Sequence, residues 1–308
     1  MHKVRLTGLG LCIEDAQRPL WRDLHAAFEA RPGAAWLPSK EHADASELVP
    51  SKERRILSGD DVIGICTADL ACRDANPEWA DDAACIVVNT GKHTVEGERE
   101  TYRRKFMKAD ATLDGLEMAH AVERGEAQIN PFSLLRTLDN NVLWWLCRYR
   151  NFGAVNLQLT QRTTPSFFAL WEAVELVREG SATQVLVGGT QTIAQASVDR
   201  TQESERFVRS ADDAVGGGAV FFVLESEDSA RARGRAGYAE LSLEAPLQAQ
   251  VETLVRDQEV GVTGGGRAPG IASLLGLLDA TLQQRPIHLA GAHRDAAVIG
   301  VRPTGALR

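Results

Sequence analysis

The sequence predicts an α/β fold with a largely buried sheet. Two segments, residues 83–88 and 219–224, are continuously apolar, which is typical of strands covered on both faces. Other segments place apolar residues at helical spacing. The clearest of these comprises Phe167, Leu170, Trp171, Val174 and Val177. Strands that alternate with helices along most of the chain indicate a layered α/β architecture.

In the first part of the chain, Val4 to Gly10 is expected to be a strand that runs into a tight glycine turn at Gly8-Leu9-Gly10. Residues 51–74 are expected to form a helix that stops near Asn76-Pro77, before the strand at 83–88. Residues 92–130 are charged and weakly periodic, and we expect them to form an excursion that lies over the core.

The later elements follow from the same patterns. In chain order they are a helix from Pro131 through Leu146, an alternating strand at Val155–Thr160, a helix at 167–177 capped by Gly180, strands at 184–187 and 219–224, a helix at 271–282 that Pro286 stops, and a last strand at 296–301. No repeat, low-complexity segment or linker interrupts this order.

Composition excludes several classes of protein. The net charge of −8 over 308 residues argues against a nucleic-acid binder, which needs a basic face. No stretch approaches the roughly 20 apolar residues that span a bilayer, and no signal-peptide pattern opens the chain, so a cytoplasmic protein is expected. The five cysteines are odd in number and lack metal-ligand spacing, which predicts buried thiols in a reducing compartment. Neither a metal nor a cofactor is expected.

The segment from Gly153 to Gly189 carries a resemblance to a known family. A strand, a sharp turn and an amphipathic helix are followed by Arg178-Glu179-Gly180 and a strand that ends in Gly188-Gly189. This order resembles the nucleophile region of the β-ketoacyl synthases, in which a strand delivers a cysteine to the N-terminus of a buried helix. Such a helix end lowers a thiol's pKa and stabilises the attacking thiolate.

Further segments in the same order extend the resemblance over about 240 residues. They are Thr7-Gly8-Leu9-Gly10, the strand from Cys85 to Gly91, Arg206-Phe207, Gly216-Gly217-Gly218-Ala219, Leu224-Glu225, Ala230 to Gly234, and Tyr238-Ala239-Glu240. The resemblance implies a thiolase-like layered fold (helix/sheet/helix/sheet/helix). Residues 1–245 would form a complete N-terminal half, and residues 246–308 a strongly reduced C-terminal half on the same core.

The catalytic groups of that family are missing at the matching positions. The family's spacing, counted back from Gly189, puts the nucleophile position at Thr163, with Gln161, Arg162 and Thr164 beside it. No cysteine lies near this position. The histidine position of the family's lysine-bearing motif falls at or near Gly264, and neither of the family's histidine motifs is present. We therefore expect no catalytic residue of the ketosynthase type.

Structural explanations compete with functional ones at several positions. Thr163 is expected to be a filler that bonds nearby backbone, while Arg162 would either hold an acidic group or lie exposed in a turn. The glycine runs lack the ending of a P-loop and are explained better by close backbone packing. Two aromatic groups fit the core or the wall of an acyl tunnel. They are Trp144-Trp145 and Phe167-Phe168-Trp171.

The resemblance implies a function without chemistry of its own. Cysteine-less members of the family are the chain-length-factor subunits of type II polyketide and aryl polyene synthases. They form heterodimers with a catalytic ketosynthase, receive acyl carrier protein through the complex, and shape the acyl tunnel. The strand before the nucleophile pairs across the dimer axis in the family, so the resemblance puts the interface at Val155, Asn156, Leu157, Gln158, Leu159 and Thr160.

Two other classes of function stay open. One is a stand-alone acyl-thioester hydrolase or decarboxylase that works through Thr163, Thr164 or Ser166, and it requires a histidine or carboxylate within reach of one of those hydroxyls. The other is a homodimeric scaffold that binds acyl groups or carrier protein without a partner subunit.

Overall fold

The computed structural model describes most of the chain in separate ranges. These are residues 2–13, 36–37, 43–89, 135, 138, 140–150, 152–160, 165–191, 218–244, 254–256, 272–284, 286–290 and 298–305. The expected excursion at 92–130 therefore lies outside the described residues. No helix within them is both long and apolar enough to cross a membrane.

The predicted elements that fall among the described residues occur in the predicted order, and two short strands at Trp36–Leu37 and Leu254–Arg256 were not predicted. The strands are β1 (Val4–Ile13), β2 (Trp36–Leu37), β3 (Ala84–Asn89), β4 (Asn156–Leu159), β5 (Gln184–Gln191), β6 (Gly218–Ser226), β7 (Ala239–Glu244), β8 (Leu254–Arg256), β9 (Ile287–Ala290) and β10 (Val298–Pro303). The helices are the 3-10 turn η2 (Glu53–Ile56), α2 (Gly59–Ala75), α6 (Asn141–Arg150), α7 (Pro165–Glu179), α9 (Glu227–Ala232) and α10 (Ala272–Leu282).

The strands hydrogen-bond in the order β4-β3-β5-β6-β1-β7-β10-β9-β8, and β2 pairs with β1. The pairs β4-β3 and β3-β5 are parallel, whereas β6 runs antiparallel to both β5 and β1. Strand β1 also pairs with β7. It therefore joins a first group of strands, β4-β3-β5-β6-β1, to a second group, β7-β10-β9-β8.

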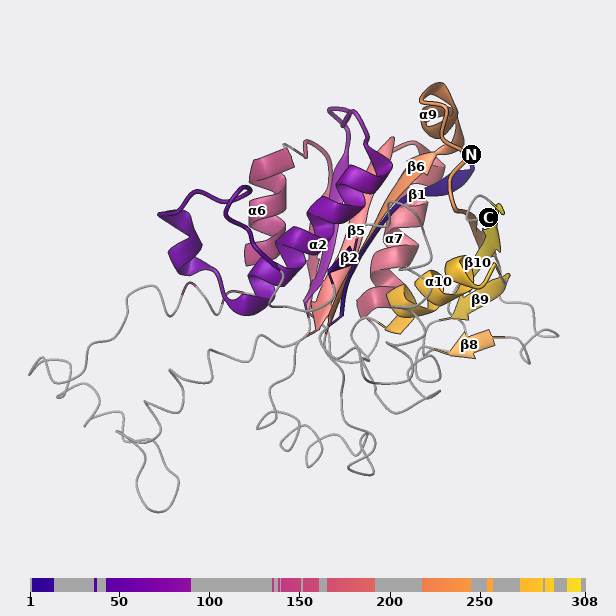
Figure 1. Ribbon diagram of the computed structural model, residues 1–308. Coiled ribbons are helices and arrows are strands. Elements are labelled where there is room, and N and C mark those ends of the chain that lie inside the picture. Colours follow the sequence, from indigo (N-terminus) through magenta and orange to yellow (C-terminus); the bar gives the residue numbers. More distant parts are fainter. Residues whose placement is uncertain are drawn as a thin grey trace, which may run out of the picture.

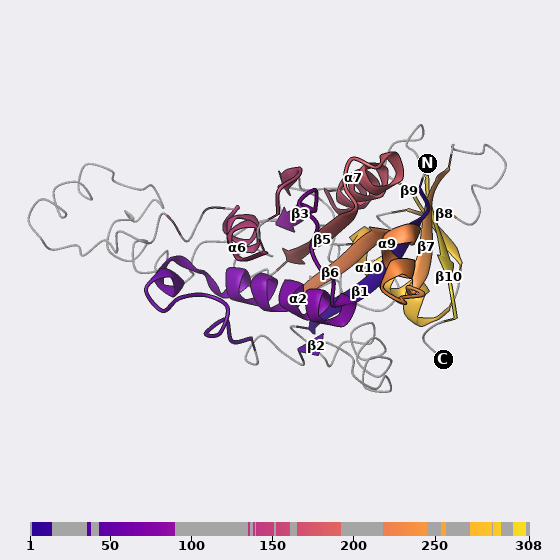
Figure 2. The same cartoon turned by 90° about the horizontal axis from the view of Figure 1, so that it is seen from above.

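Helices and strands form successive layers (Figure 1). Helices α2 and α6 cover one face of the first group of strands, and α7 and α10 lie between that group and β7-β10-β9. Figure 2 shows α2 and α7 on opposite sides of β5 and β6. The continuous apolar run of β6 explains this sandwich, because Phe221 and Val223 pack toward α2 while Phe222 and Leu224 pack toward α7 and α10.

The second group of strands has one apolar and one polar face. Leu241, Leu243 and Ile299 join the core beneath α7 and α10. The opposite face carries polar side chains that bond one another. Glu244 accepts a hydrogen bond from Ser242 at 3.1 Å and lies 3.3 Å from Nε2 of His288. No described helix covers this polar face, so the last helix layer of the expected helix/sheet/helix/sheet/helix order stays a prediction.

The glycine turn expected at the end of the first strand is not observed. Strand β1 continues through Gly8 and Gly10 to Ile13, with a register shift between Leu6 and Gly8. A Cβ atom on Gly10 would lie 2.1 Å from the carbonyl oxygen of Thr67 in α2. The glycines therefore let a helix approach the strand, which is the close packing that the sequence indicates.

The helices end where the sequence predicts, but two of them begin later than predicted. The helix expected over residues 51–74 begins at Gly59, after the separate turn η2, and the helix expected from Pro131 is interrupted at Leu138 and Asn140 before α6. Helix α2 ends at Asn76, which adopts a left-handed conformation (φ 45°), just before Pro77. Gly180 adopts φ 79° after α7, as expected of a C-cap. The described helix near the tryptophan pair begins at Asn141, and residues 131–134 lie outside the described part of the chain.

Candidate functional site

The candidate site lies where three parallel strands end and helix α7 begins. Because β3, β4 and β5 are parallel, their carboxyl ends lie at one edge of the sheet. Only residues 160–164 separate β4 from Pro165, the first residue of α7, so the helix begins at that edge. Ligand sites of α/β proteins occur at the carboxyl ends of strands, and helix N-termini stabilise negative charge.

The core holds α7 in place. Its buried side chains pack against both groups of strands and against α10. Phe167 and Leu170 are almost completely buried, and Ser166, in the first turn, is 0% exposed. A helix fixed in this way between two layers holds its N-terminal N–H groups in a constant position, as a preorganised anion-stabilising site requires.

Close packing also shapes the neighbouring strand β5. A Cβ atom on Gly188 would lie 2.2 Å from the ring of Phe221. Two residues later, Thr190 is 1% exposed, and its Oγ1 has no hydrogen-bond partner among the described residues. In α2, a Cβ atom on Gly64 would meet Thr190 at 2.7 Å. Gly188 thus allows the close packing of Phe221 on β5, near the edge where the site lies.

The residues expected at the vacated nucleophile position lie outside the described part of the chain. Thr163 and its neighbours Gln161, Arg162 and Thr164 fall between β4 and α7, and Gly264 falls between β8 and α10. The sequence alone places them, so their roles stay predictions. Of the three hydroxyl residues that a stand-alone enzyme could use, the structure describes Ser166. Ser166 is completely buried, so a substrate cannot reach its hydroxyl in this conformation.

The expected interface strand is the outer strand of the sheet. β4 pairs with β3 and, among the described residues, with no other strand. Val155, just before it, is 43% exposed. Both polar atoms of the Gln158 side chain are buried and have no hydrogen-bond partner in the described part of the molecule. The alternating pattern of the strand did not predict a buried Gln158 amide, because it predicts that a glutamine at this position is exposed.

The aromatic residues divide between core and surface. Trp145 and Phe167 are buried, as the core interpretation predicts. That interpretation is wrong for Trp144 and Phe168, whose side chains are exposed. The Arg148 guanidinium instead stacks over the Trp144 ring in a cation–π contact, 5.4 Å from the ring centroid. Helix α6 has to cover the sheet with one face only, so adjacent tryptophans point to different sides.

The five cysteines are thiols in the structure, and four of them are buried, as predicted. Burial raises the pKa of Cys72 to about 12, and burial together with Asp69 raises that of Cys66 to about 12. Burial first, and then the nearby Cys147 thiol, 62 positions further along the chain, raise the pKa of the Cys85 thiol. Spacing analysis missed this pair because only the packing of α6 on β3 brings the two residues together.

Comparison with known proteins gives relatives over part of the chain. The 3-oxoacyl-[acyl-carrier-protein] synthase 2 of Vibrio harveyi is 28% identical over 147 residues, which are 42% of this chain and 35% of the relative. The synthase of the same name from Vibrio cholerae serotype O1 is 25% identical over 168 residues, 48% of this chain and 41% of the relative. The chain thus matches less than half of the length of either relative. No family model matches the chain.

Solved structures match the fold over nearly the whole chain. A β-ketoacyl synthase from Burkholderia phymatum has a TM-score of 0.63 at 15% identity, and the match covers 99% of this chain and 100% of that one. The ishigamide ketosynthase/chain length factor has a TM-score of 0.58 at 14% identity, covering 98% and 99%. A type II polyketide synthase ketosynthase in complex with its acyl-carrier protein has a TM-score of 0.61 at 14% identity, covering 98% and 99%.

These likenesses cover nearly the whole chain and show its fold. The chain therefore has the thiolase-like layered fold of the β-ketoacyl synthases, and part of its sequence is similar to the 3-oxoacyl-[acyl-carrier-protein] synthases.

Proposed function

We propose that the chain is a catalytically inactive, chain-length-factor-like subunit that forms a heterodimer with an active β-ketoacyl synthase. One observation carries the proposal. The segment that joins β4 to the N-terminus of α7 reads Thr160-Gln161-Arg162-Thr163-Thr164, and it contains no cysteine. A threonine hydroxyl is a weak nucleophile unless a base activates it. The scaffold that would present a nucleophile is kept, but the nucleophile is not.

The outer strand supports the proposal of a partner chain. An outer strand presents unpaired backbone groups to any chain that can add a strand. Among the described residues β4 pairs only with β3, so a partner strand could extend the sheet at its other edge. The partner would supply the cysteine and histidines, and this chain would supply interface area and part of the acyl tunnel wall.

The relatives support the identity of the partner. One similar structure is described as a ketosynthase/chain length factor, and another is an acyl-carrier protein in complex with its ketosynthase. By analogy, acyl carrier protein would reach this chain through the complex, in polyketide or fatty-acid-type elongation. The division of the chain near residue 245 and a cytoplasmic location stay predictions.

Co-expression tests the proposal. The chain is produced with a full-length ketosynthase from the same genome, and size-exclusion chromatography with mass detection measures the assembly. We expect a 1:1 complex. Val155→Asp should weaken the complex at least tenfold, because an exposed residue next to β4 gains a charge at the proposed interface. A monomer or homodimer that ignores the ketosynthase would refute the proposal.

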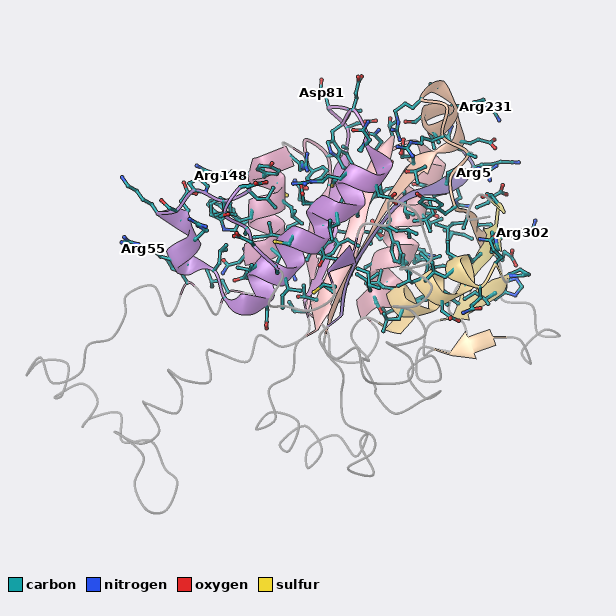
Figure 3. The ribbon with its side chains drawn as sticks, in the orientation of Figure 1. Arg5, Arg55, Asp81, Arg148, Arg231 and Arg302 are labelled. Carbon is teal, nitrogen blue, oxygen red and sulfur yellow. The ribbon has the colours of Figure 1, made fainter. Side chains whose placement is uncertain are left out.

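The matched control changes charge at the opposite end of the sheet. Arg302 on β10 is exposed and lies far from Arg148 on α6, which is close to the β4 side of the molecule (Figure 3). Arg302→Glu should leave the complex intact. If both substitutions weaken it equally, β4 is not the interface. Thioester turnover by the chain alone that is lost in Thr163→Ala would favour the enzyme alternative instead.

A further inference from the structure

Buried polar atoms without partners gather between helix α6 and the sheet. Both polar atoms of the Gln158 side chain, Oγ1 of Thr190 and Nε1 of Trp145 are buried and have no hydrogen-bond partner among the described residues. Trp145, on α6, is 2% exposed, and Thr190, on β5, is 1% exposed. An unsatisfied buried polar atom favours any conformation in which water reaches it, because water supplies the missing hydrogen bond. Opening this layer of the molecule would therefore relieve three side chains at once.

The side chains from the strands lie on the face of the sheet that α2 and α6 cover. Gln158 on β4 is paired with Val87 on β3, which belongs to the apolar cluster on that side. Paired residues of neighbouring strands point to the same face. For Thr190, a Cβ atom on Gly64 of α2 would lie 2.7 Å from its Cγ2. The same Cβ atom would lie 3.0 Å from Cγ2 of Val142, in the first turn of α6.

Strand β4 is weakly attached to the sheet. It has four residues and pairs, among the described strands, with β3 alone. Only residues 151–155 separate it from the end of α6, so a displacement of one element pulls on the other. Short outer segments of this kind open locally while the rest of a protein stays folded.

Two polar contacts attach α6 to helix α2. Asn141, the first residue of α6, donates to the Asp61 carboxylate at 3.2 Å. Arg150, its last residue, forms an ion pair with Asp69. Both carboxylates belong to α2. Helix α6 can therefore separate from the strands while it stays attached to α2.

We propose that α6 and β4 open together as one local unit, while β3, β5, β6 and β1 keep their hydrogen bonds. Opening brings water to the Gln158 amide, the Thr190 hydroxyl and the Trp145 indole N–H. It also uncovers the carboxyl ends of β3 and β5, beside the candidate site. The unit is thus a movable cover next to that site. The inference concerns this chain alone and does not depend on the proposed function.

Amide hydrogen exchange tests the proposal on the full chain, with mass spectrometry as the readout. After correction for intrinsic rates, we expect amides of α6 and β4 to exchange faster than those of β5 and α7 by about tenfold or more. The opening constants of α6 and β4 should agree within about threefold, because the two elements open together. Exchange as slow as that of β5, or clearly different opening constants for α6 and β4, would overturn the proposal.

A matched pair of substitutions isolates the cause of the opening. Thr190→Val replaces the unpartnered hydroxyl by a methyl group of the same shape, so exchange in α6 and β4 should slow by about fivefold. Thr281→Val is the control, since Thr281 is equally buried but its hydroxyl donates to the Leu277 carbonyl at 2.7 Å. The control should not slow exchange in α6 or β4.

A second variant keeps the test valid if the first fails to fold. Gln158→Leu removes the unpartnered amide, and it should slow exchange in α6 and β4 in the same way as Thr190→Val. If neither variant slows this exchange, or if Thr281→Val slows it equally, the unpartnered atoms do not drive the opening and the proposal is refuted.

Discussion

Gly8 and Gly10 lie where α2 crosses β1, and the space beside each is already filled. Gly10→Ala would put a methyl group against the Thr67 carbonyl, so α2 and β1 would have to separate. We expect the free energy of unfolding to fall by about 1–3 kcal/mol. Urea denaturation measures it, with Gly59→Ala as control, since no atom lies within 4 Å of a Cβ there. Equal effects of the two substitutions would contradict this account.

Arg233 neutralises a carboxylate that is shut off from solvent. Glu225 is 0% exposed and forms an ion pair with Arg233, whose Nη1 also donates to the carbonyl oxygens of Ala75 and Asn76 at 2.9 Å. Arg233→Met leaves a buried, uncompensated charge, and we expect a loss of about 3–5 kcal/mol in unfolding free energy. Arg231→Met removes an exposed arginine of the same helical segment, and it should change the value by less than about 0.5 kcal/mol. Similar losses in thermal and urea unfolding of both variants would rule out a special role for the buried pair.

At the scale of elements, the start of α2 depends on a reciprocal cap. The Ser58 hydroxyl accepts from the Asp61 backbone N–H at 3.2 Å, and the Asp61 carboxylate accepts from the Ser58 N–H at 2.8 Å. Asp61 also accepts from Asn141, the first residue of α6. Ser58→Ala should cost about 1 kcal/mol in unfolding free energy. Ser58→Thr, which keeps a hydroxyl, should retain most of it, and a thermal melt that does not separate the two variants would contradict the capping role.

Most elements could be predicted from the sequence, whereas their contacts could not. Continuous apolar runs predicted β3 and β6, because a strand buried on both faces has apolar residues at every position. Helical spacing predicted α7, because a helix that packs on one side has an apolar stripe. The continuation of β1 through Gly8 and Gly10 was missed, since a glycine in a strand and a glycine in a turn look alike until the packed helix is known. The thiol pair and the buried Gln158 amide arise from tertiary packing, which no local pattern records.

At the scale of the molecule, the face of β7, β10 and β9 that points away from α7 and α10 is polar. Its side chains form a polar cluster in which Glu244 lies near His288 and 4.0 Å from Arg302. Replacing Glu244 and His288 together by leucine would create an apolar patch on a sheet face. We expect this variant to self-associate at concentrations where the unaltered chain does not, as measured by light scattering. Unchanged scattering would mean that another part of the chain covers this face.

The candidate site was predictable only as far as the resemblance reaches. The layered α/β fold is confirmed by the solved structures, because that fold is recorded in the spacing of several segments, whereas the order of the strands was not predicted. The vacated position at Thr163 lies in a connection outside the described residues, so its role stays a prediction. A site is expected there because the carboxyl ends of parallel strands lie beside the N-terminus of a helix that is held in place, and such helix ends stabilise negative charge.

The position of β1 in the middle of the sheet also constrains the order of events during synthesis. This strand is synthesised well before β6, which begins at Gly218, and β7, which begins at Ala239, and apart from the two-residue β2 these are the strands with which it pairs. Such distant pairing slows folding and leaves an apolar strand waiting for its partners. The nascent chain therefore needs protection from aggregation until β6 and β7 have been made, and truncated products that end before β6 should be captured by chaperones rather than fold.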